Sequence, residues 1–423
     1  MENTTLVSRR QILRDTSLGL VVATLWPAGR LSGAERGRPP RILVKSSWQT
    51  VNIGDIGHTP GIIRLLNEYL PDAQITLWPN DVRDGVEELL RRNFPKLQWA
   101  QSAEEVRHAF AESDFLLHGS GASFVAEKHV ARWHKETGKP YGIYGITLSS
   151  VSNDARELLN NARFIFFRDS DSLAFAKDQK FTCPLMEFGP DAAFGVNLRN
   201  DEAAIAFLKA RGLEEGRFLC VIPRLRYTPY WKIRNKQMTA EDQRKHARNE
   251  GMKEHDHAPL REAIVAVTRQ SDMKVLVCPE DQSQMAIGKQ MLVDLLPDDV
   301  KAKVVWRDTY WLTDEAVSTY TRSAGLFGLE MHSPIMCVGN GVPAIVCRFK
   351  EQTTKGLMWR DIGLGDWLFD MDEPSEVARL VPTVLSLVRD PGGTKAKLAK
   401  AQEFVHRRQA QTMAIVARSS GPT

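Results

Sequence analysis

The sequence predicts an α/β protein built from two doubly wound parallel-sheet halves, and two features of the chain support this prediction. Short, nearly continuous apolar runs alternate with amphipathic stretches from Arg41 onward. Strands of this kind, separated by helices, are typical of a parallel sheet covered on both faces. The pattern lapses around residues 195–217, at a polar helix and a Gly-rich turn, and then begins again. In such folds ligands bind beyond the carboxyl ends of the strands, so we expect the functional residues in the loops at those ends.

The elements follow this alternation in order. The first half, residues 41–195, has candidate strands at 42–44, 75–78, 97–100, 115–117, 141–146 and 164–167, with helices expected at 60–70, 82–93, 103–112 and 124–137. The second half, residues 217–370, has candidate strands at 218–223, 274–278, 304–306, 325–329 and 344–347. Residues 371–423 are expected to form C-terminal helices.

Composition narrows the class of protein. The 423 residues are 43% hydrophobic and 26% charged, which excludes a wholly disordered chain. A net charge of +4 is too small to indicate nucleic-acid binding. No apolar run reaches the ~18 residues of a spanning helix, so we expect a soluble or tethered protein. The five cysteines lack metal-ligand or disulfide spacing, and three lie in apolar runs, so we expect buried, unpaired thiols.

The N-terminal residues 1–34 resemble a twin-arginine export signal. Arg9 and Arg10 precede a weakly apolar stretch, and small residues follow at 32–34. This pattern predicts export by a twin-arginine route, which leaves the protein periplasmic or membrane-anchored. If the segment is neither cleaved nor translocated, the protein stays on the cytoplasmic side. A basic terminus that happens to contain an Arg pair is the alternative.

A long basic and aromatic connection, residues 224–257, follows the first strand of the second half. Loops of this length are usually functional or disordered. One interpretation is a flap that grips an anion or stacks on a sugar, and the other is a solvated insertion with its own short helix. Within it, the adjacent residues of His255-Asp256-His257 lack a complementary third ligand, so we predict no metal site there or elsewhere.

Several loops at predicted strand ends carry polar or glycine-rich motifs. Asn52-Ile53-Gly54-Asp55 and His118-Gly119-Ser120-Gly121 follow the first and fourth strands. They suit close approach of an anion or substrate, and the alternative is that they form ordinary tight turns. Arg168 and Pro190-Asp191 come later in the first half. In the second half Glu330-Met331-His332-Ser333-Pro334 follows a strand, with Ser333 expected as helix cap and Pro334 as the first helical residue. Gly341 and Pro343 come next, followed by Lys350 and Lys355.

In this order the motifs, spread over roughly residues 45–360, resemble the polysaccharide pyruvyl transferase family. The resemblance implies two Rossmann-like domains of the glycosyltransferase-B kind. It also implies transfer of pyruvate from phosphoenolpyruvate to two sugar hydroxyls of a glycan acceptor as a cyclic ketal, with no cofactor. His332 and Asp55 would be catalytic, His332 as general acid or base. The residues implied to bind substrate are Asn52, Gly54, Gly119, Ser120, Gly121, Arg168, Asp191, Arg224, Glu330, Lys350 and Lys355.

The chain departs from the family pattern at two positions. Glu330 stands where the family has an arginine two residues before its histidine, and Ser120 replaces a glycine. We expect Glu330, if it faces the site, to pair with an arginine or to contact neutral hydroxyls, because an unpaired buried carboxylate is costly. Asp55 and Asp191 either orient acceptor hydroxyls or bond turn amides. The alternatives to pyruvyl transfer are a glycosyltransferase with a nucleotide-sugar donor and an exported, non-catalytic glycan-binding or assembly protein.

Overall fold

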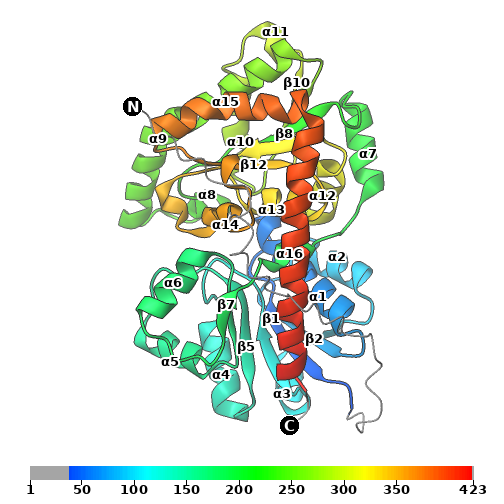
Figure 1. Cartoon of the computed structure of the whole chain (residues 1–423), viewed down its shortest axis with the longest axis vertical. Helices are drawn as coiled ribbons and strands as arrows, with labels where there is room; N and C mark the ends of the chain where they lie inside the picture. Colours follow the sequence, from blue (N-terminus) through cyan, green and yellow to red (C-terminus); the bar gives the residue numbers. More distant parts are fainter. Residues whose placement is uncertain (1–37, 422–423) are drawn as a thin grey trace, which may run out of the picture. The chain divides into compact units, whose positions relative to one another are not determined.

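Two parallel sheets organise the chain in the computed structural model, which describes residues 38–421 (Figure 1). The predicted export signal lies outside the described residues. The first sheet has the strand order β3-β2-β1-β4-β5-β6-β7. Its strands are β1 (Arg41–Ser46), β2 (Gln74–Pro79), β3 (Gln98–Trp99), β4 (Phe115–His118), β5 (Tyr141–Ile146), β6 (Ile165–Phe167) and β7 (Met186–Phe188).

The second sheet has the order β10-β9-β8-β11-β12-β13. Its strands are β8 (Phe218–Ile222), β9 (Lys274–Val277), β10 (Val304–Trp306), β11 (Gly325–Gly328), β12 (Ala344–Arg348) and β13 (Leu368–Asp370). In both sheets the first strand of the half is central, the next two lie on one side and the rest on the other. This reversal of strand order creates the crevice at which doubly wound folds bind ligands, and it confirms the predicted fold class.

Helices connect successive strands. In the first half these are α1 (Ile53–Tyr69), α2 (Val86–Asn93), α3 (Ala103–Glu112), α4 (Glu127–Thr137), α5 (Asn153–Asn161) and α6 (Ser170–Asp178), and α7 (Asp201–Ala210) leads to the second half. The second half contains α8 (Tyr230–Ile233), α9 (Ala240–Gln270), α10 (Gln284–Gly288), α11 (Asp298–Lys301), α12 (Thr313–Tyr320), α13 (His332–Gly339) and α14 (Met358–Asp361). None of the helices within residues 38–421 combines the length and apolarity needed to cross a membrane.

The central strands are completely buried and the edge strands are not. All residues of β4, β5, β8 and β11 are buried, which explains their continuous apolar sequences. The sequence reading missed β7 and β13, three-residue edge strands that contain the acidic residues Glu187 and Asp370 and are only partly buried. An edge strand needs no apolar side chain on its outer flank, so its sequence resembles a loop.

The long connection at residues 224–257 is mostly helical. Helix α9 begins at Ala240 behind a capping box of Thr239 and Asp242, so the expected loop holds the first half of a 31-residue helix. Arg226 is buried and donates to Asp256, Glu351 and Asp372, which ties this segment to the second half. Asp256, the acidic member of the His-Asp-His run, is therefore part of a structural ion-pair cluster.

Two C-terminal helices follow, α15 (Pro374–Arg389) and α16 (Pro391–Ser419), the latter drawn in red in Figure 1. Helix α16 packs against α1 and α13, and the hydroxyl of Thr412 lies 3.0 Å from that of Tyr144 on β5. All five cysteines are buried and unpaired, as predicted.

Candidate active site

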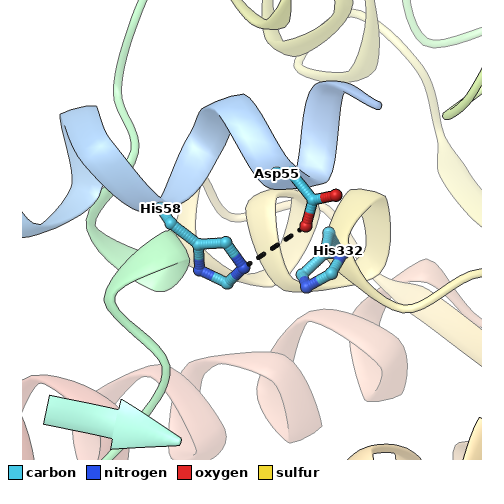
Figure 2. Close-up of side chains that lie close together, drawn as sticks. All are labelled: Asp55, His58 and His332. Carbon is cyan, nitrogen blue, oxygen red and sulfur yellow. Dashed lines mark ion pairs between the residues drawn. The ribbon is translucent and has the colours of Figure 1, made fainter. Parts of the chain in front are cut away.

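Asp55, His58 and His332 converge from two helices that are far apart in the sequence (Figure 2). His58 Nε2 lies 3.9 Å from Asp55 Oδ1. The imidazole rings of His58 and His332 meet edge to face, with centroids 4.9 Å apart. One nitrogen of each ring and one carboxylate oxygen all lie within 4.8 Å of one another. The two residues predicted to be catalytic, His332 and Asp55, are thus neighbours, and His58 is a third member that sequence reasoning missed.

Helix α1 starts at Ile53, directly after Asn52, and this start positions two of the three side chains. Asn52 Oδ1 accepts hydrogen bonds from the amides of Gly54 and Asp55, so its side chain caps the helix. Asp55 and His58 are three residues apart, which places them on the same helix face. A Cβ at Gly54 would lie 2.3 Å from His332 Cβ, so only glycine allows α1 to approach His332 this closely.

Three predicted residues, Ser120, Asp191 and Arg168, support His58 from behind. His58 Nδ1 lies 2.7 Å from Ser120 Oγ and 3.2 Å from Asp191 Oδ1. Arg168 Nη1 donates to Asp191 Oδ2 at 2.6 Å, and both side chains are fully buried. Burial opposes ionisation of Asp191, but the adjacent His58 and Arg168 outweigh it and hold the pKa of Asp191 well below its usual range. Asp191 also accepts a hydrogen bond from the backbone amide of Ala193.

His332 is the first residue of α13 and is held by Glu280. Its Nδ1 lies 3.2 Å from Glu280 Oε1, and Glu280 Oε2 accepts the amide of Ser333 at 2.6 Å. Ser333 is therefore inside the helix and not its cap as expected, because the buried Glu280 carboxylate takes over that role. Burial, with further contributions from His58 and Lys355, lowers the pKa of His332 to about 3, so the resting imidazole is neutral. Glu280 was missed, although it follows the end of strand β9.

Glu330 pairs with Arg224, which confirms one of the two expectations for this carboxylate. Arg224 Nη1 donates to Glu330 Oε2 at 2.6 Å, and Gln284 Nε2 donates to Glu330 Oε1 at 2.7 Å. Much of the charge of Arg224 is therefore neutralised. Of the two candidate lysines, Lys355 belongs to the site, since it interacts electrostatically with Glu330, Glu280 and His332.

Lys350 is exposed, and its amide donates to Asp372. No contact joins Lys350 to the Asp55–His58–His332 cluster among residues 38–421. Gly119 and Gly121 flank Ser120, and their amides donate to the carbonyls of Lys45 and Gly145. They shape the turn that presents Ser120 to His58.

A short stretch of the 224–257 segment reaches the site. Tyr230 of α8 is exposed, and its hydroxyl accepts a hydrogen bond from Gln49, which also donates to Asp55. The covered part of the Tyr230 ring and, second, the nearby Asp55 carboxylate raise the pKa of Tyr230. The segment thus contributes one aromatic residue beside Asp55, while the rest of it forms α9.

Carboxyl groups outnumber cations around the cluster. Five carboxyl groups (Asp55, Asp191, Glu280, Asp281 and Glu330) face three cations (Arg168, Arg224 and Lys355). Burial raises the pKa of Asp281 to about 6 and also raises that of Glu280. His58 Nε2 and Asp55 Oδ1 lie 3.9 Å apart, and one nitrogen of His332 belongs to the same cluster. This arrangement can accept protons or bind a positively charged group.

The fold and the family are supported by comparison with known proteins. HepE from Anabaena, in complex with UDP and glucose, has a TM-score of 0.54 and 12% identity, covering 90% of this chain and 100% of that chain. MnaA from S. aureus, with UDP, has a TM-score of 0.53 and 9% identity, covering 89% and 95%. UGT71G1 from Medicago truncatula, complexed with UDP-glucose, has a TM-score of 0.51 and 10% identity, covering 90% and 98%.

At these identities the similarity shows the fold alone, the predicted pair of Rossmann-like domains of the glycosyltransferase-B kind. No curated protein sequence matches the chain. The family model described as polysaccharide pyruvyl transferase matches residues 52–350, a span that runs from Asn52 to Lys350 and contains the whole Asp55–His58–His332 cluster. The chain belongs to the polysaccharide pyruvyl transferase family.

Proposed function

We propose that this protein transfers the pyruvyl group of phosphoenolpyruvate to two hydroxyls of a glycan, forming a ketal. The observation that carries the proposal is the cluster of His332, His58 and Asp55 inside the span matched by the family model. The family histidine is buried and its Nε2 has no hydrogen-bond partner, which leaves that nitrogen available to a substrate hydroxyl.

The reaction balances without a redox partner. One glycan oxygen bonds to C2 of phosphoenolpyruvate while C3 gains a proton, and the bond from C2 to the phosphate oxygen breaks. The second glycan oxygen then bonds to C2. Of the two hydroxyl protons released, one ends on C3 and the other leaves with the phosphate. The neutral imidazole of His332 would accept the first proton and pass it to C3.

Lys355 and Arg224 are the cations that would hold the anionic donor. The side chain of Lys355 has no hydrogen-bond or ion-pair partner within residues 38–421. Burial, followed by repulsion from Arg224, lowers the pKa of Lys355. A carboxylate or phosphate beside Lys355 would favour its charged form. Arg168 is less suited to this role, because it is fully buried against Asp191.

A nucleotide-sugar glycosyltransferase is the second candidate. Solved structures that share the fold hold UDP, with or without a sugar. The hypothesis that Glu330 accepts a ribose diol has less support, because both Glu330 oxygens already accept hydrogen bonds from Arg224 and Gln284. A third candidate is a non-catalytic glycan-binding protein.

Phosphate release from phosphoenolpyruvate with a panel of glycan acceptors tests the proposal. We expect release to depend on the acceptor and to fall by ~10²- to 10⁴-fold in His332→Gln, with the unfolding midpoint little changed. His108→Gln, an exposed histidine on α3, is the control and should keep full rate. Full activity in His332→Gln would refute the assigned role. Release of UDP from UDP-sugars instead would favour the glycosyltransferase, and glycan binding without turnover the non-catalytic protein.

The export signal remains a prediction that bears on donor supply, because phosphoenolpyruvate is a cytoplasmic metabolite. Cell fractionation with sequencing of the mature N-terminus tests it. A mature chain that starts at Glu35 outside the cytoplasm would count against pyruvyl transfer. An intact N-terminus on the cytoplasmic side, either soluble or membrane-anchored, agrees with it.

A further inference from the structure

The Asp55–His58–His332 cluster contains buried nitrogens without partners. His58 is fully buried, and its Nδ1 lies 2.7 Å from Ser120 Oγ and 3.2 Å from Asp191 Oδ1. A carboxylate only accepts hydrogen bonds, so the contact with Asp191 places a proton on Nδ1. Nε2 of His58 has no hydrogen-bond partner in the structure.

His332 repeats this arrangement from the other helix. Its Nδ1 faces the Glu280 carboxylate at 3.2 Å, which assigns the ring proton to that nitrogen. Its Nε2 is also buried and unpartnered, and the residue is 4% exposed. An unsatisfied buried acceptor costs roughly 1–3 kcal/mol. The buried Nε2 atoms of His58 and His332 both lack a partner in one cluster, which leaves both nitrogens available to a bound group.

The third inward-facing atom is an anionic oxygen. Asp55 Oδ2 accepts a hydrogen bond from Gln49, and Oδ1 faces His58 Nε2 at 3.9 Å (Figure 2). That distance is too long for a shared proton to form a hydrogen bond. One ligand atom from each of the three side chains lies within 4.8 Å of the other two, and each side chain is fixed from behind by a hydrogen bond to a different neighbour.

We propose that Asp55, His58 and His332 bind one divalent transition-metal ion through Oδ1 and the two Nε2 atoms. Two imidazoles and one carboxylate form the three-ligand set of catalytic zinc sites and of non-haem iron sites, which leave coordination positions open. The carboxylates behind each ring, Asp191 and Glu280, are the outer-shell partners that metal-ligating histidines usually have. The imidazoles favour zinc, iron or cobalt over magnesium or calcium.

Small movements would complete the coordination. Ligand atoms ~2.1 Å from a tetrahedral ion lie about 3.4 Å apart, whereas these atoms lie within 4.8 Å of one another. Asp55 is the partly exposed member, with a side chain 17% exposed, and a change in its torsion angles can supply the closure. The excess of carboxyl groups around the cluster favours a cation, and an anionic donor would bind more readily once that cation is present.

The local sequence did not indicate this site, because Asp55 and His58 lie three residues apart on α1 but the third ligand, His332, comes from α13. The proposal does not rest on pyruvyl transfer, because ion binding can be measured without any substrate. When the ion is bound, His332 is a ligand and not a proton acceptor. Activation of an acceptor hydroxyl would then pass to the ion, which makes a hydroxyl in its open position more acidic.

Direct metal titration tests the proposal. The full chain, purified without a polyhistidine tag and dialysed against chelator, would be titrated with Zn²⁺ by calorimetry and with Co²⁺ by visible absorption. We expect one ion per chain and Co²⁺ bands of low-symmetry nitrogen and oxygen coordination. Asp55→Asn should weaken affinity by at least ~10- to 100-fold, the range found for disturbing even outer-shell partners. Absence of binding to the parent chain would overturn the proposal.

Two further variants make the test specific. His257→Gln is the matched control, since His257 is also fully buried with an unpartnered Nε2 but lies on α9 outside the cluster. Its affinity should equal that of the parent. Glu280→Gln keeps the His332 ligand while weakening its outer-shell partner, and its affinity for the ion should fall ~10- to 100-fold. Equal binding by Asp55→Asn and the parent, or binding of Mg²⁺ in preference to Zn²⁺ and Co²⁺, would refute coordination by this cluster, whether or not the protein transfers pyruvate.

Discussion

Arg168 and Asp191 form a completely buried ion pair, with Arg168 Nη1 2.6 Å from Asp191 Oδ2. The same carboxylate lies 3.2 Å from Nδ1 of His58 through its other oxygen. The pair therefore holds Asp191 against Nδ1 of His58, while the other ring nitrogen, Nε2, lies 3.9 Å from Asp55 Oδ1. Arg168 reaches the cluster through Asp191 and His58, as a positioning residue would, and its contact with substrate stays a prediction.

Removal of Arg168 alone should destabilise the protein strongly. Arg168→Met leaves Asp191 buried without its cation, and breaking a buried pair typically costs ~3–5 kcal/mol in the free energy of unfolding. Urea unfolding measures the loss. Arg83→Gln, which removes an exposed pair with Asp81, is the control and should leave the midpoint nearly unchanged. The double variant Arg168→Met/Asp191→Asn should recover part of the stability, and a double variant no better than the single one would contradict this account.

Gly54→Ala should disturb the Asp55–His58–His332 cluster, whereas the matched change Gly251→Ala should stabilise the protein. At Gly54 the new Cβ would lie 2.3–2.5 Å from atoms of His332, so the ring must shift. Activity or metal affinity should fall at least tenfold. Gly251 is an exposed helix residue with open space around its Cβ, and Gly251→Ala should gain ~0.5–1 kcal/mol. Urea unfolding and assays of activity or metal affinity, carried out on both variants, test this prediction. Retained function in Gly54→Ala would show that His332 need not stay close to α1.

Glu330→Gln should tighten the binding of phosphoenolpyruvate. The change keeps the shape of the side chain and frees the charge of Arg224 for the donor. We expect the dissociation constant, measured by calorimetry, to fall several-fold, and Arg224→Gln to raise it. Replacement of Glu330 by arginine is less informative, since it would bury two guanidinium groups side by side. Unchanged affinity in both variants would separate this ion pair from the donor site.

Stability should fall as the pH drops below about 6.5. Burial lowers the pKa of His118 and His332 to about 3 and that of His257 to about 4, so the unfolded chain takes up protons that these folded residues refuse. Each such histidine contributes a slope of ~1.4 kcal/mol per pH unit between its folded pKa and ~6.5. Asp281, with its pKa raised to about 6, acts in the opposite direction between about pH 4 and 6 and offsets one of them.

Urea unfolding at pH 7, 6 and 5 measures this slope. His257→Gln should reduce the slope by about one proton, because Gln can keep the hydrogen bond to the Lys253 carbonyl while removing the titrating ring. His108→Gln removes an exposed histidine and should leave the slope unchanged. Parallel pH profiles for the parent and His257→Gln would contradict a buried, neutral His257.

The strands show which elements the local sequence predicts correctly. The predicted strand 141–146 coincides with β5, because a buried central strand must be apolar along its whole length. The predicted strand 304–306 coincides with β10, a partly buried edge strand that is nevertheless apolar. The predicted helix starts agree less well with the structure. Residues 53–59 were expected as a Gly-rich turn, yet they form the first turns of α1, since the Asn52 cap and packing against α13 compensate for the low helix propensity of Gly54 and Gly57.

By itself, the sequence determined the two-sheet α/β fold, the buried cysteines and the positions of most polar motifs at strand ends. These properties depend on apolar pattern and turn chemistry within short windows. Only the tertiary structure decided what the motif residues contact. It placed Arg168 on Asp191, Glu330 on Arg224 and Glu280 beneath α13, and it brought His58 to His332. The physical reason is that charge pairing and metal-ligand geometry depend on distances between elements, which no local pattern encodes.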